Sequence, residues 1–262
     1  MTTPTTSIVG VIPGHLASVR FPQKILFPFA GLPMIEHVRR RALMADGLDK
    51  VVVATGDQEI EDTVRAAGGE VIPTNRAHEN GTSRVAEAVA NMDCEHIVLL
   101  QGDEPLLLPS HIEILLSAIK TEPEADFWNV TGPINSEDEL DRHSFVKCAV
   151  GPDSRILYCF RRSPSHASFE LQTGYIRKIL GLFAFRRDVL LELAQTPQTP
   201  IERAELIEQM RLIETGRRVV SVPVDRALPS VNEPHEADIV LSELESDLEQ
   251  KALLERVLAQ SQ

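Results

Sequence analysis

Residues 13–24 form the first stretch whose side chains could do chemistry. This loop follows a short β-branched run and offers Ser18, Arg20 and Lys24 as hydrogen-bond donors. Arginine and lysine neutralise the negative charge that builds up in phosphoryl transfer, so the loop suits a triphosphate. It contains neither the GxxxxGKS/T phosphate loop nor the GxGxxG of dinucleotide-binding proteins. The alternative is a basic loop that is only solvated.

Residues 101–105, with the sequence QGDEP, form the second such stretch and come directly after an apolar run. An aspartate at the end of a buried strand is a good ligand for Mg²⁺, which takes one or two carboxylates and completes its shell with substrate phosphates. Gly102 lets a ligand approach the backbone closely, because it has no side chain. Asp103 is therefore the candidate metal ligand. The alternative is a turn in which Asp103 only caps the helix that follows Pro109.

Two predicted helices begin with residues that could serve a site. Thr82 and Arg84 open one of them, where free backbone N–H groups could hold an anion or a base edge. The alternative is that Thr82 is a plain N-cap. In the other helix, Thr199 and Glu202 form a predicted capping box, and Glu205 shares a face with Glu202. The alternative there is an ordinary surface helix.

The first half of the chain alternates strand and helix patterns that would position these stretches. Short β-branched or apolar runs predict strands, and apolar residues at helical spacing predict helices. The alternation predicts an α/β fold with a mainly parallel sheet covered by helices on both faces. In such sheets ligands bind beyond the carboxyl ends of the strands, where loops 13–26 and 101–105 lie. The predicted strands cover residues 7–12, 50–54, 70–73 and 96–100, and the predicted helices cover 33–44, 58–67, 82–92 and 109–120.

The second half of the chain lacks the regular alternation of strand and helix patterns and includes an irregular stretch at residues 157–176. No clean linker separates it from the first half. We therefore expect a single domain over residues 1–262 with an inserted arm around residues 130–180. The predicted strands here cover residues 127–134, 145–156, 180–185 and 219–224, and the predicted helices cover 188–194, 201–215 and 233–259, the last either continuous or interrupted.

The composition narrows the class of protein. The chain has 262 residues, with 26 Lys and Arg against 39 Asp and Glu, so its formal net charge is −13. Nucleic-acid-binding proteins are more often basic, and that class is disfavoured. The sequence contains no run of about 18 apolar residues, so no membrane-spanning helix is predicted. Residues 1–14 lack the positively charged start that is typical of a signal peptide. The three cysteines are scattered, which is typical of core residues in a reducing compartment. We expect a cytoplasmic protein.

Taken together, the four stretches resemble the 3-deoxy-manno-octulosonate (Kdo) cytidylyltransferase family, from about Val11 to about Leu241. The family's QGDEP is intact, and its first loop is matched at six positions. The matches are Pro13, Ser18, Arg20, Pro22, Lys24 and Leu26 in the first loop, residues 31–35 (GLPMI), residues 81–84 (GTSR), residues 101–105 (QGDEP), residues 162–164 (RSP) and residues 199–211.

The resemblance implies a Rossmann-like nucleotidyltransferase fold and the coupling of CMP from CTP to an acidic sugar, with release of pyrophosphate. It also implies Mg²⁺, a homodimer, and a place in lipopolysaccharide biosynthesis, with no nucleic-acid or membrane partner. By this resemblance Lys24, Arg20 and Asp103 are catalytic, and Asp103 and Asn232 bind the metal. The implied nucleotide-binding residues are Pro13, Gly14, His15, Ser18, Arg20, Lys24, Thr82, Arg84, Gln101 and Gly102, and the implied acceptor-binding residues are Gln101, Arg162, Glu202 and Glu205.

The chain departs from the family pattern at four places. His15 replaces an arginine, Asn232 replaces an aspartate, and Ser83 replaces a glutamate; residues 179–186 lack the histidine of the family's strand. Three interpretations follow. The chain is a cytidylyltransferase acting on Kdo or a related ulosonic acid, or one acting on another acidic acceptor such as a keto acid or a phosphonate, or a non-catalytic homologue that binds nucleotide. The sequence leaves CTP and another pyrimidine triphosphate as alternatives.

Overall fold

The computed structural model describes residues 7–260 and divides the chain into two compact units. Residues 1–113 and 228–262 make up the first unit, and residues 114–227 make up the second. The predicted arm at residues 130–180 falls within the second unit. The carboxyl-terminal segment, although distant in sequence, belongs to the same unit as the loops at residues 13–24 and 101–105.

The sheet of the first unit is parallel, with the strand order β6-β1-β4-β5. Its strands are short β-branched or apolar runs, as predicted, and all but β5 are largely buried: β1 (Ile8–Gly14), β4 (Lys50–Thr55), β5 (Glu70–Pro73) and β6 (His96–Leu100). Helices α1 (Met34–Ala42), α2 (Gln58–Ala66) and α3 (Gly81–Val89) connect them. The predicted α/β fold with a mainly parallel sheet is confirmed. Because the strands are parallel, the loops that follow β1, β4 and β6 meet at one edge of this sheet.

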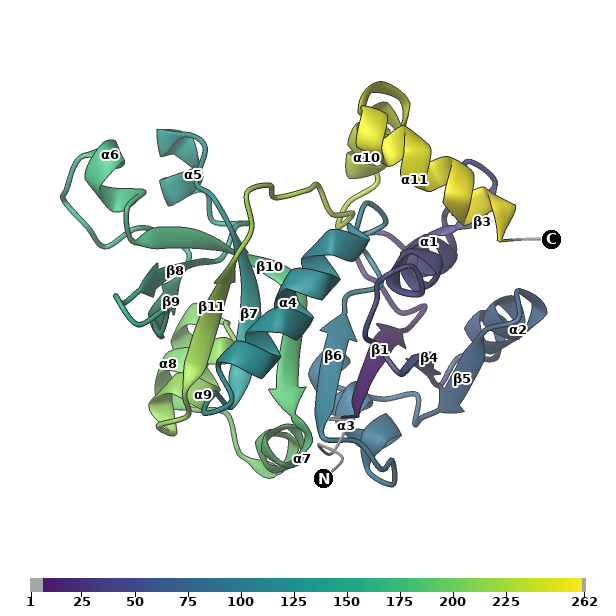
Figure 1. The fold of residues 1–262 in the computed structure, drawn as a ribbon, viewed down its shortest axis with the longest axis horizontal. Coiled ribbons are helices and arrows are strands. Elements are labelled where there is room, and N and C mark those ends of the chain that lie inside the picture. The colour runs from purple at the N-terminus through teal and green to yellow at the C-terminus, as the bar shows by residue number, and fades with distance from the viewer. Residues whose placement is uncertain (1–6, 261–262) are drawn as a thin grey trace. The chain divides into compact units, whose positions relative to one another are not determined.

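The carboxyl-terminal segment adds two helices to the first unit, α10 (Glu236–Ser246) and α11 (Leu248–Ala259). The predicted helix over 233–259 is interrupted at Asp247, whose backbone is extended (φ −82°, ψ 127°). The Asp247 side chain then caps α11 by accepting from the Gln250 N–H at 2.8 Å. Helix α11, yellow in Figure 1, runs beside α1, and Arg40 Nη1 donates to the Val257 carbonyl at 3.0 Å.

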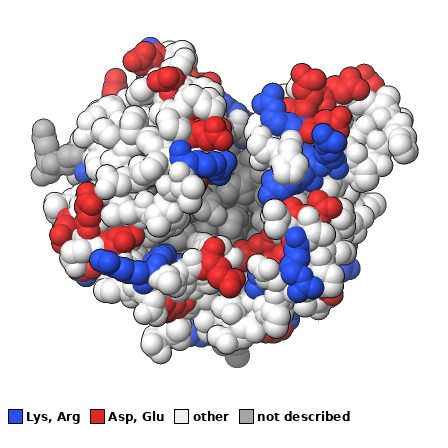
Figure 2. Space-filling view, turned by 180° about the vertical axis from the view of Figure 1, so that it is seen from behind, with Lys and Arg blue, Asp and Glu red and all other residues white. Residues whose placement is uncertain are grey.

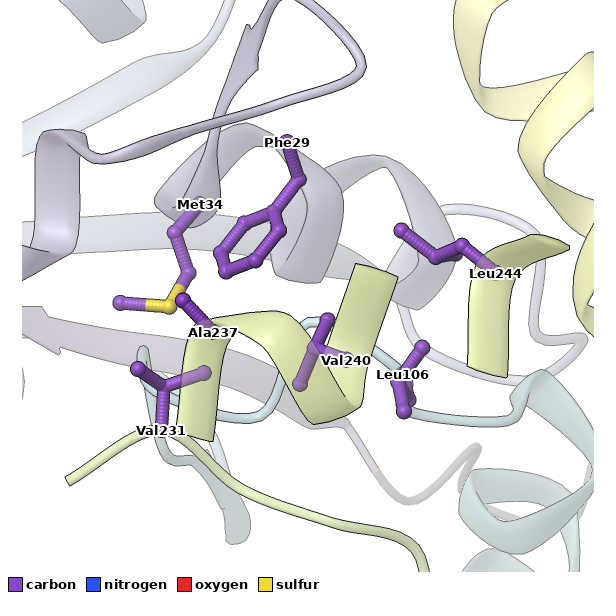
Figure 3. Close-up of a cluster of buried hydrophobic side chains, with 7 residues drawn as sticks. All are labelled: Phe29, Met34, Leu106, Val231, Ala237, Val240 and Leu244. Carbon is purple, nitrogen blue, oxygen red and sulfur yellow. The ribbon is translucent and has the colours of Figure 1, made fainter. Parts of the chain in front are cut away.

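A buried hydrophobic cluster fixes α10 to the first unit (Figure 3). The cluster also includes Phe29 of the short strand β2 (Pro28–Phe29) and Met34, which opens α1 directly after β3 (Leu32–Pro33). Both strands follow the 3₁₀ turn η1 (Lys24–Leu26). It therefore connects the end of the first loop with the carboxyl-terminal helices. Its members are Phe29, Met34, Leu106, Val231, Ala237, Val240 and Leu244, with Phe21, Phe27, Leu228, Leu241 and Leu254 packed against them.

The second unit is mostly antiparallel. Strand β7 pairs in parallel with β11 and antiparallel with β10, which in turn pairs with β8, and β8 pairs with β9. The strands are β7 (Phe127–Gly132), β8 (Lys147–Val150), β9 (Ile156–Phe160), β10 (Ile176–Arg186) and β11 (Val219–Pro223), and the helices are α5 (Glu137–Asp141), α6 (Phe169–Gln172), α7 (Arg187–Gln195), α8 (Pro200–Glu205) and α9 (Gln209–Glu214), after α4 (Pro109–Thr121) leads in.

Three predictions for the second unit are wrong in detail. The single strand predicted at 145–156 is the hairpin β8–β9, because the chain turns where Ser154 has a φ of +62°. The helix predicted at 201–215 is two helices, since Leu206 adopts a left-handed conformation with a φ of +56°. The stretch expected to be irregular at 157–176 contains the end of β9 and helix α6.

Charged side chains of both signs are interleaved on the face of the molecule that Figure 2 shows. Cys148 and Cys159 are buried opposite each other on β8 and β9, while Cys94 is half-buried, and all three are free thiols. Among the described residues, no helix combines the length and the apolar character needed to cross a bilayer.

Candidate active site

The loop after β1 is held in place by the loop after β4. Asp57 Oδ2 accepts from the Leu16 N–H at 2.9 Å, and the Asp57 N–H itself donates to Thr55 Oγ1 at 3.1 Å. Farther along, Gln23 turns the chain into η1 through a left-handed φ of +57°. The loop is therefore anchored at its beginning and turned sharply at its end, where Lys24 lies. Sequence reasoning missed Asp57, although it follows strand β4 just as Asp103 follows β6.

Lys24 and Asp103 lie together at this edge of the sheet. Lys24 Nζ is 2.6 Å from Asp103 Oδ2 and donates to the Val231 carbonyl at 3.0 Å. The Val231 N–H in turn donates to the Asp103 carbonyl at 2.9 Å. The side chains of Lys24 and Asp103 are 14% and 23% exposed, so their charges are only partly screened by water. Three distant segments thus place a cation and a carboxylate side by side.

The turn that carries Val231 is ordered by the start of α10. Glu236 Oε2 accepts from the N–H groups of Asn232, at 2.6 Å, and Glu233, at 2.9 Å. The Asn232 amide nitrogen donates to Ser230 Oγ at 3.2 Å, which directs its carbonyl oxygen elsewhere. Glu233 faces Arg20 at 3.7 Å, but both side chains are about half exposed or more, so this pair is weak.

The donor set around Asp103 fits a cation that takes only part of its shell from the protein. Asp103 Oδ2 is engaged by Lys24, and Oδ1 makes no hydrogen bond within the described part of the chain. Over residues 7–260 no group of three or more His, Cys, Asp and Glu side chains is gathered as a metal cage. One carboxylate with one amide carbonyl nearby in the turn, from Asn232, suits Mg²⁺, which keeps water and substrate phosphates as further ligands.

Helix α3 begins against the first loop. Its N-cap is Asn80, which accepts from the Ser83 N–H at 2.8 Å and forms a capping box with Ser83, so the alternative that Thr82 is the N-cap is wrong. A Cβ on Gly81 would lie 3.0 Å from Pro13 Cγ, so glycine lets the helix start close to this loop. Thr82 is buried at this start.

Arg84 is a buried scaffold for the loop that follows β5. Arg84 is only 3% exposed. Its guanidinium donates to Thr74 Oγ1 at 2.7 Å, to the Asn75 carbonyl at 2.9 Å and to the Arg76 carbonyl at 3.0 Å. Burial lowers the pKa of Arg84, while Asp57 and Glu87 oppose that shift. With these donors engaged, Arg84 shapes the residues around the site.

His15 brings no fixed charge to the first loop. Loss of solvation lowers the pKa of its ring, and the positive charges of Arg84 and Lys24 lower it further. Asp57 and Asp103 act in the opposite direction without reversing the shift. The ring is therefore mostly neutral at pH 7, because its ordinary pKa is already about 6.5. The neutral His15 ring can donate or accept a hydrogen bond, but it does not supply the permanent charge that an arginine would.

Gly102 is closely packed within the site itself. A Cβ there would fall 2.4 Å from Ile25 Cδ1 and 3.2 Å from the Pro13 carbonyl oxygen. The backbone of the QGDEP stretch therefore lies directly under the first loop. Gln101 is next to the start of α3, since its Oε1 would be 3.9 Å from a Cβ on Gly81. Ser18 and Arg20 lie in the same loop, half-buried and exposed respectively.

The predicted acceptor residues Glu202, Glu205 and Arg162 belong to the second unit. Glu202 is 4% exposed, and Arg211 donates to its carboxylate from Nε at 2.7 Å and from Nη2 at 2.5 Å. The predicted capping box with Thr199 is confirmed. Glu205 accepts from the Tyr158 hydroxyl at 3.1 Å, whereas Arg162 is exposed. Glu202 thus holds α8 to α9, and the roles of all three toward an acceptor stay predictions.

Comparison with known proteins places these residues in a family context. Residues 9–219 match the sequence model of a family described as cytidylyltransferase. A 3-deoxy-manno-octulosonate cytidylyltransferase of Geobacter sulfurreducens is 35% identical over 249 residues, covering 91% of this chain and 99% of the relative. One of Escherichia coli is 36% identical over 224 residues, covering 86% and 90%.

A solved structure is similar along nearly the whole chain. It is a CMP:2-keto-3-deoxy-manno-octonic acid synthetase complexed with CTP, with a TM-score of 0.87 at 34% identity. The match covers 93% of this chain and 100% of that chain. The similarity therefore extends over both compact units and includes the strand ends at which Lys24 and Asp103 meet.

Proposed function

The chain belongs to the cytidylyltransferase family, and we propose that it transfers CMP from CTP to Kdo and releases pyrophosphate. The observation that carries this proposal is the cluster of Lys24, Asp103 and Val231 at the carboxyl edge of a parallel sheet. Ligands bind at this edge in open α/β sheets. The named relatives and the CTP-bound structural neighbour support both the nucleotide and the acceptor.

The reaction joins an acidic sugar to CMP in one displacement. The anomeric hydroxyl oxygen of the sugar attacks the α-phosphorus of CTP and loses its proton, while the bond from that phosphorus to the bridging oxygen breaks. Pyrophosphate leaves with the electron pair. The protein contributes positioning and charge neutralisation, because phosphoryl-group chemistry leaves it little covalent work.

Lys24 is suited to neutralise the triphosphate without abandoning Asp103. An ammonium group has three protons, and Lys24 uses two positions, one toward Asp103 and one toward the Val231 carbonyl. The remaining proton is available to a phosphate oxygen. Arg20, exposed and loosely paired with Glu233, can turn toward the same triphosphate.

We propose that Mg²⁺ is held by Asp103 with the carbonyl oxygen of Asn232. When bound, it supplies additional positive charge at the phosphates. Asp103 would then serve both the metal and Lys24, and Lys24 would neutralise phosphate charge beside it. The amide at residue 232 contributes no charge, so we expect the metal to bind more weakly than it would to two carboxylates.

The second candidate function is the same transfer to a different acidic acceptor. Strand β10 (Ile176–Arg186) carries no histidine, which is the observation that favours it. A panel of acceptors tests both candidates: pyrophosphate release is measured with CTP, Mg²⁺ and Kdo, other ulosonic or sialic-type acids, or small phosphonates. Release with Kdo supports the first candidate, and release only with another acid supports the second. Replacing CTP by UTP tests the choice of base.

A third interpretation, a non-catalytic nucleotide-binding homologue, is disfavoured because Lys24 and Asp103 are both present and paired. The same panel tests it, since such a homologue would bind CTP and release no pyrophosphate with any acceptor. We also propose a cytoplasmic homodimer acting in lipopolysaccharide biosynthesis. The free thiols agree with a reducing compartment. Sedimentation equilibrium tests the dimer.

A further inference from the structure

The segment that follows Asp103 is held from behind by two buried side chains. Gln250 Nε2, from α11, donates to the Leu106 carbonyl at 3.0 Å, and Arg41 Nη1, from α1, donates to the Leu107 carbonyl at 3.2 Å. Gln250 and Arg41 are both 0% exposed. Buried carbonyl groups outside regular secondary structure need such donors, so these two bonds fix the path of the chain between Asp103 and helix α4.

The same segment is continuous with the candidate active site through its side chains. Leu106 is fully buried in the cluster that also contains Val231, Val240 and Leu244 (Figure 3). Val231 is the residue whose carbonyl accepts from Lys24 and whose N–H donates to Asp103. A shift of Leu106 would therefore be transmitted both along three residues of chain to Asp103 and through packing to Val231.

Gln250 is an unusual choice for a purely packing position. Its Oε1 is buried and has no hydrogen-bond partner among the described residues. An unpaired buried acceptor is unfavourable, so an amide at this position carries a cost that only its donor group can offset. The presence of a glutamine indicates that the bond from Nε2 to Leu106 is the feature of use. Gln250 lies outside residues 9–219, the part that matches the family model.

We propose that Gln250 is a positioning residue for Asp103. Its bond to the Leu106 carbonyl holds the segment so that the Asp103 carboxylate stays where Lys24 meets it and a divalent cation can reach it. This inference rests on the proposed function for its link to turnover, but its link to metal binding is independent of turnover. By this proposal the carboxyl-terminal helix α11 supports the active site indirectly, through Gln250, and contributes no side chain to the site itself.

The test compares Gln250→Met with a matched control on the same helix, Leu253→Ala. Methionine has a similar size and no donor, whereas Leu253 is buried on α11 and does not bond the segment after Asp103. For Gln250→Met we expect kcat to fall by about 10- to 100-fold with the KM for CTP within about twofold, the pattern of a misplaced catalytic group. Leu253→Ala should lower the melting temperature and leave kcat unchanged at temperatures at which it is folded.

A second readout needs no turnover. Binding of Mn²⁺ in the presence of CTP is followed by electron paramagnetic resonance, and Gln250→Met should weaken it several-fold while Leu253→Ala leaves it unchanged. If no acceptor gives pyrophosphate with the wild-type protein, the proposed function fails, and this binding measurement still decides the role of Gln250. A folded Gln250→Met variant with wild-type kcat and wild-type Mn²⁺ binding would overturn the inference.

Gln250→Glu keeps the test decisive if Gln250→Met does not fold. A buried carboxyl group is protonated more readily than usual, and its O–H can then donate to the Leu106 carbonyl. We expect two ratios of Gln250→Glu to wild type, that of kcat and that of Mn²⁺ affinity, to rise toward one as the pH falls. A ratio that is independent of pH and near one would show that the donor at residue 250 is unnecessary.

Discussion

Lys24 and Asp103 illustrate how far residue types alone can be interpreted. Both follow predicted strands, and the structure brings them to 2.6 Å of each other. The third member, the Val231 carbonyl, has no signature in the sequence because every residue carries the same backbone group. The ion pair between Glu202 and Arg211 could not be predicted from the sequence either. The spacing of residues 202 and 211 does not show that α8 and α9 are separate helices.

The first prediction at the residue scale concerns the charges of the pair. Lys24→Met and Asp103→Asn should each lower kcat for pyrophosphate release by at least about 100-fold, the scale for removing one charge-stabilising group. Circular dichroism of each variant checks that the fold is retained. A surface change at the exposed Lys251 of α11, Lys251→Met, serves as the control for loss of a lysine. Near-normal turnover in either site variant would count against the assignment.

The second prediction concerns the amide at residue 232. Asn232→Asp should lower the Mg²⁺ concentration that gives half-maximal activity, because a second carboxylate strengthens binding of a hard cation. The measurement is a magnesium titration of pyrophosphate release at saturating CTP. The neighbouring change Glu233→Gln is the matched control for altered charge in the same turn. An unchanged magnesium curve for Asn232→Asp would mean that residue 232 is not a ligand.

At the scale of elements, sequence patterns locate most strands and helices but not their interruptions. The strands of the first unit are buried β-branched runs whose pattern is unambiguous. The breaks at Leu206 and Asp247 are different, because helix-compatible residues continue on both sides of each. Leu206 takes a left-handed φ of +56° between α8 and α9, and across this turn Arg211 donates to Glu202. Tertiary packing decides such breaks, and local propensity does not report them.

Helix α1 supplies a prediction about pH. Burial lowers the pKa of His37 to about 4, with Arg41 and Arg40 adding to the shift, although its ring nitrogen lies 2.8 Å from the Phe29 carbonyl. An unfolded histidine has a pKa of about 6.5, so between these two values the unfolded chain binds more protons than the folded chain. This contribution to stability is complete above about pH 6.5 and is lost as the pH falls toward 4.

We expect His37 to lower the free energy of unfolding by roughly 2 kcal/mol between pH 7 and pH 5. His37→Gln, which can still donate to the Phe29 carbonyl, should show a smaller loss over the same interval. Urea unfolding at several pH values measures both proteins. Parallel curves for the wild type and His37→Gln would show that the ring of His37 is not buried in its neutral form.

At the scale of the whole molecule, the first unit is assembled from two segments of chain, residues 1–113 and 228–262. The sequence pattern predicts the helix over 233–259 but not its packing partner in the first unit, because amphipathic periodicity does not identify what a helix packs against. The structure shows that α10 and α11 bury Leu106 and Val231 next to the Lys24–Asp103 pair. The site therefore depends on residues on both sides of the second unit in sequence.

This arrangement predicts the effect of removing the carboxyl-terminal segment. A chain that ends at residue 227 lacks Val231 and Gln250, and it exposes Phe29, Met34 and Leu106. We expect a lower melting temperature and loss of CTP binding, measured by thermal denaturation and by calorimetric titration. The control is a chain that ends at residue 260. Wild-type melting and wild-type CTP affinity in the shorter chain would contradict the assembly described above.

The most direct test of the account is to identify the product. The protein is incubated with CTP, Mg²⁺ and Kdo, and the mixture is analysed by mass spectrometry alongside an assay for pyrophosphate. We expect a CMP–Kdo conjugate and pyrophosphate in equal amounts, and neither when Kdo is omitted. Binding of CTP without conjugate or pyrophosphate in the presence of Kdo would contradict the proposed transfer to this acceptor.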